Sequence, residues 1–95
     1  MATKLIEKSF PGKKADELYV AVEVVIRKLG QKFDIQCQYD PVKRCIVVPE
    51  KMGVKGLCTV EDGRVKVALE HGLMGTAVVG TVKGYIEEKL GKLFA

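Results

Sequence analysis

The 95-residue chain lacks several features that define large classes of protein. It has no apolar run of about 18 residues, the length at which a helix becomes a candidate for crossing a bilayer, so we expect no transmembrane segment. Its beginning carries Glu7 and Lys8 where a secretory signal peptide would be apolar, so we expect no export signal.

Cysteine and histidine are also scarce. The three cysteines, Cys37, Cys45 and Cys58, are an odd number without close pairing, which favours free thiols in the cytoplasm over a disulfide framework. His71 is the only histidine, and no Cys-x-x-Cys or His-x-x-x-His spacing is present, so we predict no metal site and no cofactor. With no serine or threonine motif near His71 and no paired carboxylates, we expect no enzymatic activity.

Charge of one sign is in only mild excess. Sixteen basic and twelve acidic residues give a net charge of +4, and the six aromatic residues do not alternate with the lysines as a base-stacking platform would. We therefore expect no nucleic-acid binding. The stretch from Gly72 to Gly75 precedes a predicted helix, but it lacks the lysine and the Ser/Thr of a phosphate-binding loop.

The composition is that of an ordinary globular protein, with 47% apolar and 29% charged residues. No repeat, linker or low-complexity tract divides the chain. The length suits one hydrophobic core, so we interpret residues 1–95 as a single domain.

Two segments have the apolar spacing of amphipathic helices, one from about Lys14 to Lys32 and one beyond His71-Gly72. The first apolar stripe consists of Leu18, Val22, Val25, Ile26, Leu29 and Phe33. The second consists of Val79, Val82, Ile86, Leu90 and Leu93, and it is widened by Val78 and Tyr85.

The remaining segments have strand periodicity. A short strand is predicted over 4–10, and apolar residues alternate around Cys37 before the turn-forming Asp40-Pro41. If Pro41 and Val42 form the hairpin loop, Cys37 faces Ile46. On the same count, Ile35 faces Val48.

Asp62-Gly63 is the strongest turn signal, because this pair accepts the backbone angles of a two-residue hairpin loop. Counting outward predicts one apolar face and one polar face. The apolar face pairs Val60 with Val65, Cys58 with Val67 and Gly56 with Leu69. The polar face pairs Thr59 with Lys66 and Lys55 with Glu70.

These elements predict an α+β fold of order β-α-β-β-β-β-α. An antiparallel sheet of four to five strands would carry both amphipathic helices on one face and leave the other face in water, a TBP-like or helix-grip-like arrangement.

Two surfaces are candidates for interaction. On the predicted outer face, Cys45, Val47, Leu57 and Ala68 would form a small apolar surface on neighbouring strands. On one flank of the second helix, Gly80, Gly84 and Gly91 would let another element approach its backbone closely, since interior glycines otherwise weaken a helix.

The chain resembles the polyhydroxyalkanoic acid system protein family over roughly residues 14–95. The resemblance depends on the stretches 53–57 and 60–63, the alternating Val65, Val67 and Leu69, the stretch 72–74, and the closing helix to Leu93-Phe94. It implies a small bacterial cytoplasmic protein that is associated with polyhydroxyalkanoate storage granules, and it supplies no catalytic residues.

We therefore expect a binding protein that contacts a hydrophobic granule surface or a protein partner. Two alternatives are a carrier with a small-ligand cavity beside Gly56, Cys58 and Cys37, and a homodimeric structural protein joined through its sheet edges or the glycine flank.

Overall fold

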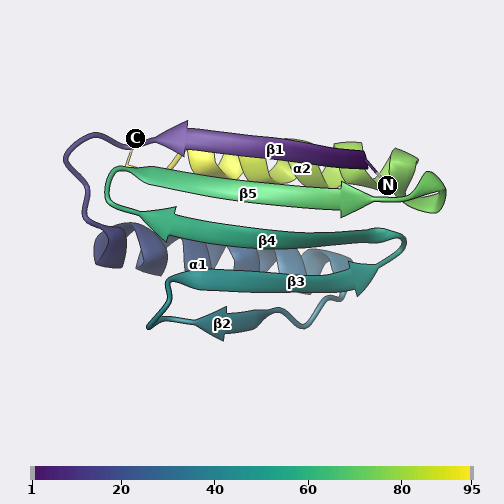
Figure 1. The fold of residues 1–95 in the computed structure, drawn as a ribbon, viewed down its shortest axis with the longest axis horizontal. Coiled ribbons are helices and arrows are strands. Elements are labelled where there is room, and N and C mark those ends of the chain that lie inside the picture. Colours follow the sequence, from purple (N-terminus) through teal and green to yellow (C-terminus); the bar gives the residue numbers. More distant parts are fainter. Residues whose placement is uncertain (1, 95) are drawn as a thin grey trace.

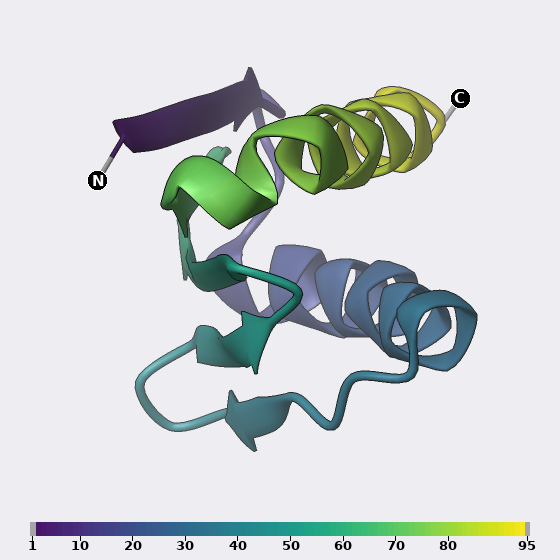
Figure 2. The same ribbon diagram turned by 90° about the vertical axis from the view of Figure 1, so that its right-hand side faces the viewer.

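The computed structural model describes residues 2–94 as one antiparallel sheet with two helices packed on the same face (Figure 1). The elements in chain order are β1 (Ala2–Ser9), α1 (Ala15–Phe33), β2 (Gln38–Asp40), β3 (Cys45–Lys51), β4 (Val54–Glu61), β5 (Arg64–His71), the 3-10 helix η1 (Leu73–Gly75) and α2 (Thr76–Gly91). Figure 2, turned by a quarter rotation, shows both helices on one side of the sheet. This arrangement confirms the predicted α+β class and the predicted order of strands and helices.

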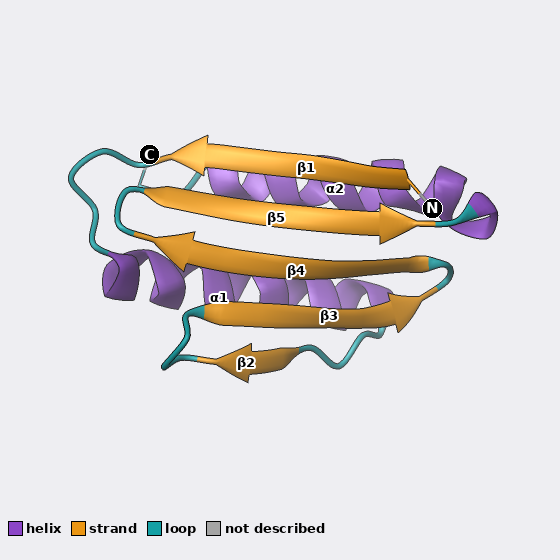
Figure 3. Cartoon of the chain, in the orientation of Figure 1, coloured by secondary structure: helices purple, strands orange, loops and turns teal. Residues whose placement is uncertain are grey.

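The sheet has the spatial order β1-β5-β4-β3-β2, so the first strand lies at one edge beside the last strand (Figure 3). β1 pairs with β5 along its whole length, from Ala2 opposite His71 to Ser9 opposite Arg64. The predicted first strand is confirmed, although it begins two residues earlier than expected. Pairing with β5 fixes the beginning of the chain in the sheet.

Both helices bury their predicted stripes against the sheet, α1 on β4 and β5 and α2 on β1 and β5. Helix α1 agrees with the predicted span to within one residue at each end. Full burial of one aliphatic side chain stabilises a fold by roughly 1.5–3 kcal/mol, so these stripes dominate the stability. The helix residues of the core are Leu18, Val22, Val25, Ile26 and Leu29 from α1 and Val79, Val82, Ile86 and Leu90 from α2.

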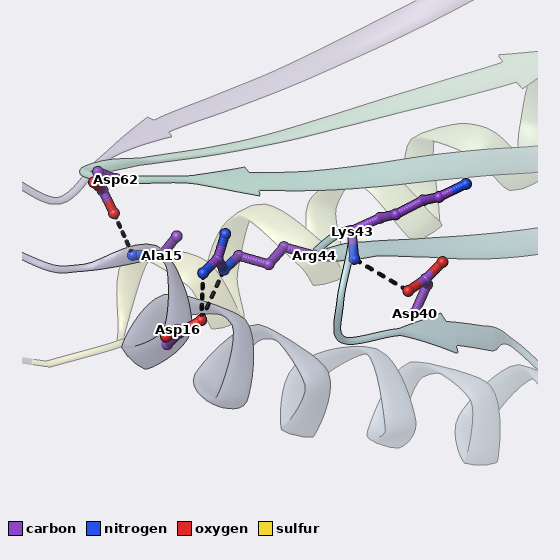
Figure 4. Close-up of polar contacts among 6 residues, drawn as sticks. All are labelled: Ala15, Asp16, Asp40, Lys43, Arg44 and Asp62. Atoms are coloured by element: carbon purple, nitrogen blue, oxygen red, sulfur yellow. Dashed lines mark hydrogen bonds and ion pairs between the residues drawn. The ribbon is translucent and has the colours of Figure 1, made fainter.

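The β4–β5 hairpin has the predicted register throughout, including all three inner pairs and both outer pairs named above. Its loop is Asp62-Gly63, and Gly63 takes φ +74°. Asp62 has a second role that the sequence did not reveal. The backbone N–H of Ala15 donates to Asp62 Oδ1 at 2.7 Å, while Lys14 at the N-cap position of α1 makes no capping bond with its side chain (Figure 4).

The predicted register of the β2–β3 hairpin is wrong by two residues. Tyr39, not Cys37, lies opposite Ile46, and the strand begins at Gln38, so that Ile35 precedes it. The loop has four residues instead of two. Asp40 Oδ1 accepts the backbone N–H of Lys43 at 3.1 Å, and Arg44 takes φ +53°, which together close a longer turn.

A shift of two residues leaves every side chain on its original face, because the period of a strand is two. Ile46 and Val48 therefore remain buried, as the sequence predicted. The error affected which residues lie opposite them and where β2 begins.

The β3–β4 turn, Met52-Gly53, went unnoticed in the sequence. Both residues take positive φ, 54° and 80°, as a type I′ turn requires. The turn packs against η1, where a Cβ on Gly53 would lie 2.8 Å from the backbone nitrogen of Gly75. A Cβ on Gly75 would in the same way collide with the carbonyl of Gly53. The two glycines therefore pack backbone against backbone, and we call this end of the molecule the interlocked end.

The glycine flank of α2 does not contact α1 or the sheet. A Cβ added at Gly80, Gly84 or Gly91 would meet no atom within 4 Å among residues 2–94. Close packing of another element on this flank is therefore not found within the described chain. Packing of a partner there remains a prediction.

Replacing Gly84 by alanine is expected to stabilise the monomer by up to about 1 kcal/mol, because the helix gains propensity and nothing in the chain opposes the new methyl group. Gly75→Ala is the matched control and should destabilise the fold, since the backbone of Gly53 occupies that space. Chemical denaturation at several protein concentrations measures both changes. A concentration-dependent loss of stability in Gly84→Ala would instead show that another copy packs on the flank.

Removing the cap from the β4–β5 turn is expected to destabilise the protein. Asp62→Ala should lower the free energy of unfolding by about 1 kcal/mol, the usual loss for an N-cap side chain. Asp62→Asn retains the accepting oxygen and should recover most of the loss. Glu61→Ala, one residue away and limited to exposed ion pairs, is the control. Equal denaturation midpoints for the aspartate and alanine forms would contradict the capping role.

Candidate interaction surface on the open sheet face

The face of the sheet opposite the helices carries no other element of the described chain (Figure 2). Four apolar side chains form a row across this face, because the register places Leu5 opposite Ala68, Ala68 opposite Leu57, and Leu57 opposite Val47. Leu5 is 60% exposed, Leu57 45% and Val47 40%, while Ala68 is half-buried. We call these four residues the apolar row.

The structure brings together three of the four residues predicted for this surface, namely Val47, Leu57 and Ala68. Cys45 lies on the same face, two residues before Val47 in β3 and opposite Thr59, and it is half-buried. Leu5 was missed, because nothing in the sequence showed that β1 would join the sheet beside β5. Its place next to Ala68 extends the row to the edge strand.

Ion pairs border the apolar row on both sides. Lys55 and Glu70 pair across β4 and β5 at 3.5 Å on one side. On the other side, Arg64 contacts Glu7 at 3.2 Å and Lys66 contacts Glu61 at 3.7 Å. Exposed pairs of this kind contribute about 0–1 kcal/mol to stability. Their main effect is to keep the borders hydrated and to confine the apolar surface to one narrow row.

A shallow hollow lies over the centre of the row. It is lined by Leu57 and Ala68, by the backbone of Gly56, and by Lys55 and Glu70. Side chains of both charges thus surround an apolar floor. Such a surface suits a broad apolar partner better than a small ligand that needs enclosure.

The thiols and the histidine lie in separate parts of the fold. Cys58 is fully buried in the core, and burial raises the pKa of its thiol to about 12. Burial also raises the pKa of Cys37, which precedes β2. Thiols with raised pKa values stay protonated at neutral pH and are poor nucleophiles.

His71 is mostly buried at the end of β5. Its Nδ1 lies 3.2 Å from the carbonyl oxygen of Gly72, whereas Nε2 has no partner among the described residues. Within residues 2–94, no three His, Cys, Asp or Glu side chains lie close enough together to hold a metal ion. The described helices also include none that is long and apolar enough to cross a membrane.

The interlocked end of the molecule is a second exposed apolar feature. Leu73 and Met74 of η1 are 93% and 88% exposed, and Met52 of the adjoining turn is 60% exposed. These three residues lie at the same end because Gly53 packs on Gly75. The sequence did not predict their exposure, since they fall outside both the helical and the strand periodicities.

The space is filled beside Gly56 and Cys58, two of the three small residues next to which a ligand cavity was predicted. A Cβ on Gly56 would lie 2.9 Å from Leu69 Cδ2, and Cys58 is fully buried among core side chains. Small side chains on the inner face therefore accommodate larger neighbours at these positions. The structure gives no support there to a ligand cavity between sheet and helices.

Comparisons with known proteins agree with the resemblance seen in the sequence. Searches of curated proteins and of solved structures found no match. The model of one family, described as "Putative polyhydroxyalkanoic acid system protein", matches residues 12–94, which is nearly the whole chain. The matched part includes both helices and four of the five strands. The chain therefore belongs to the polyhydroxyalkanoic acid system protein family.

Proposed function

We propose that the protein is a non-enzymatic binding protein that attaches to polyhydroxyalkanoate granules in the cytoplasm through the open face of its sheet. The apolar row is the observation that carries this proposal. It is continuous over four strands and has no covering element in the described chain. Membership of the family supports this choice of partner, because the family is described as a putative polyhydroxyalkanoic acid system protein.

The chemistry of a polyester surface suits this face. The polymer presents apolar chain segments, which would cover the row, and ester carbonyl oxygens, which accept hydrogen bonds. Lys55 and Lys66 lie on either side of the row and carry ammonium groups that can donate to such carbonyls. The face thus offers an apolar contact with donors along both borders.

The size of the row limits the strength of attachment. Full burial of a leucine or valine contributes roughly 1.5–3 kcal/mol, and these side chains are only about half exposed before binding. Complete covering of Leu5, Leu57 and Val47 therefore contributes a few kcal/mol, which corresponds to weak binding by a single copy. We expect a reversible coat on a large surface and not a tight one-to-one complex.

The other two candidate functions receive less support. A carrier of small hydrophobic ligands would need space between sheet and helices, yet Leu69 fills the region beside Gly56. A homodimeric structural protein could bury the apolar row against a second copy. Light scattering distinguishes that case, because it measures whether the protein is a dimer. A sheet face that is buried in a dimer could not also contact the granule.

Leu57→Lys is expected to weaken attachment to purified polyhydroxyalkanoate particles by about tenfold or more, since it places a charge in the centre of the row that must lose water on contact. Co-sedimentation over a range of particle concentrations measures the effect. Val20→Lys is the matched control, because Val20 is a 66% exposed valine on α1, on the other side of the molecule.

Equal co-sedimentation of the wild type and Leu57→Lys would contradict a contact through the sheet face. A loss of binding in Met74→Lys alone would place the contact at the interlocked end instead. If the wild-type protein itself stays in the supernatant, attachment to the granule is wrong.

A further inference from the structure

The outer surface of the helix pair carries a groove that the proposed granule contact does not use. Both helices lie on the side of the sheet away from the open face (Figure 2). The groove is lined by residues of α1 and of the end of the chain. Its volume is about 330 Å³, at the lower end of the range for small-molecule sites. The lining residues are Ala21, Val24, Val25 and Lys28 from α1 and Lys89, Lys92 and Leu93 from the end of the chain.

The floor of this groove is apolar. Ala21, Val24 and Val25 come from adjacent turns of α1, and Leu93 closes the floor from the opposite side. Val24 is 50% exposed, although it lies beside the buried stripe of the same helix. An apolar chain lying over Val24 would remove this exposed surface from water.

Lysines surround the floor with little negative charge to balance them. Lys28, Lys32 and Lys89 form no ion pair with any described residue, whereas Lys92 pairs with Glu88 at 3.1 Å. The ammonium groups of Lys32 and Lys89 both lie over the ring of Tyr85, at 5.0 and 5.5 Å from its centroid. Of the three lysines that line the groove, Lys28, Lys89 and Lys92, only Lys92 has an ion-pair partner among the described residues.

The pKa of Glu88, on the same helix as Lys89, reflects the positive charge around it. The pKa of Glu88 is lowered, first by its hydrogen bond from Lys92 and then by the charges of Lys92 and Lys89. Lys32 adds to the same effect from the other helix.

We propose that this groove binds an aliphatic carboxylate of medium chain length, with its chain on Ala21, Val24 and Val25 and its head group between Lys28 and Lys89. The apolar floor recognises the chain, and the ammonium groups donate charge-assisted hydrogen bonds to the carboxylate. Both halves of the ligand are required, because neither the half-exposed Val24 with its small apolar neighbours nor the solvated lysines bind strongly alone.

A short ligand fits the observed dimensions better than a macromolecular partner. An amphipathic helix docks through anchors spread over at least two of its turns, which needs a long groove. The volume of about 330 Å³ is instead at the lower end of the range for small-molecule sites. The site is therefore of the size of one alkyl chain and one head group.

The experiment uses the full chain labelled with ¹⁵N and titrated with octanoate, with 1-octanol and with acetate. Octanoate is expected to shift the amide signals of Ala21, Val24, Val25 and Lys89 in a saturable manner. Octanol lacks the charge and acetate lacks the chain, so each should bind about tenfold more weakly or not at all, as expected when one of two contributing interactions is lost.

Charge variants locate the head group. Lys89→Glu is expected to reduce octanoate affinity about tenfold, because an attraction becomes a repulsion at the groove. Lys43→Glu makes the same change in net charge on the β2–β3 loop and should leave the affinity unchanged. Lys28→Glu repeats the test from the other helix, and circular dichroism shows that each variant is folded.

Several results would overturn the inference. Octanol binding as tightly as octanoate would show unspecific apolar adsorption, and equal losses in Lys89→Glu and Lys43→Glu would show only bulk attraction. Shifts confined to Leu57 and Ala68, or no shifts at all, would place no ligand in the groove. An acidic amphipathic peptide that shifts the groove amides when octanoate does not would identify a protein partner instead. None of these outcomes affects particle co-sedimentation, which tests the opposite face.

Discussion

The apolar contact between the two helices and a single face of the sheet determines which surfaces of this protein are available for binding. The inner side chains of the strands alternate with outer ones, so burying one set against α1 and α2 necessarily turns the other set outward. With no third layer in the described chain, the outer set remains uncovered. The apolar row is exposed for this reason.

The same contact also creates the groove on the other side of the molecule. Two helices that lie side by side on a sheet contact each other near the sheet and leave a groove between their outer surfaces. Here this groove is apolar at Val24 and basic at Lys28 and Lys89. One packing arrangement thus leaves two chemically different surfaces. One is an open face with paired charges, and the other is a small groove in which Lys28 and Lys89 have no ion-pair partner among residues 2–94.

The sequence predicted the features that depend on local periodicity. Both helical stripes, the order of elements and the whole register of the β4–β5 hairpin follow from spacing and from the Asp62-Gly63 turn. The β2–β3 register failed, because the side chain of Asp40 closes a four-residue loop that the proline alone does not specify. The surfaces were predicted less completely. Three features depend on contacts between segments that are distant in the sequence. These are the place of Leu5 in the apolar row, the cap of α1 by Asp62, and the approach of Lys28 to Lys89.

We propose that the open sheet face, and not the helices, contacts the granule. Hydroxyl-radical footprinting of the bound and the free protein measures the solvent accessibility of individual side chains over the whole surface at once. We expect polyhydroxyalkanoate particles to protect Leu5, Leu57 and Val47, while Val20 and Val24 react as before. Protection confined to Val20 and Val24, or to Leu73 and Met74, would contradict it.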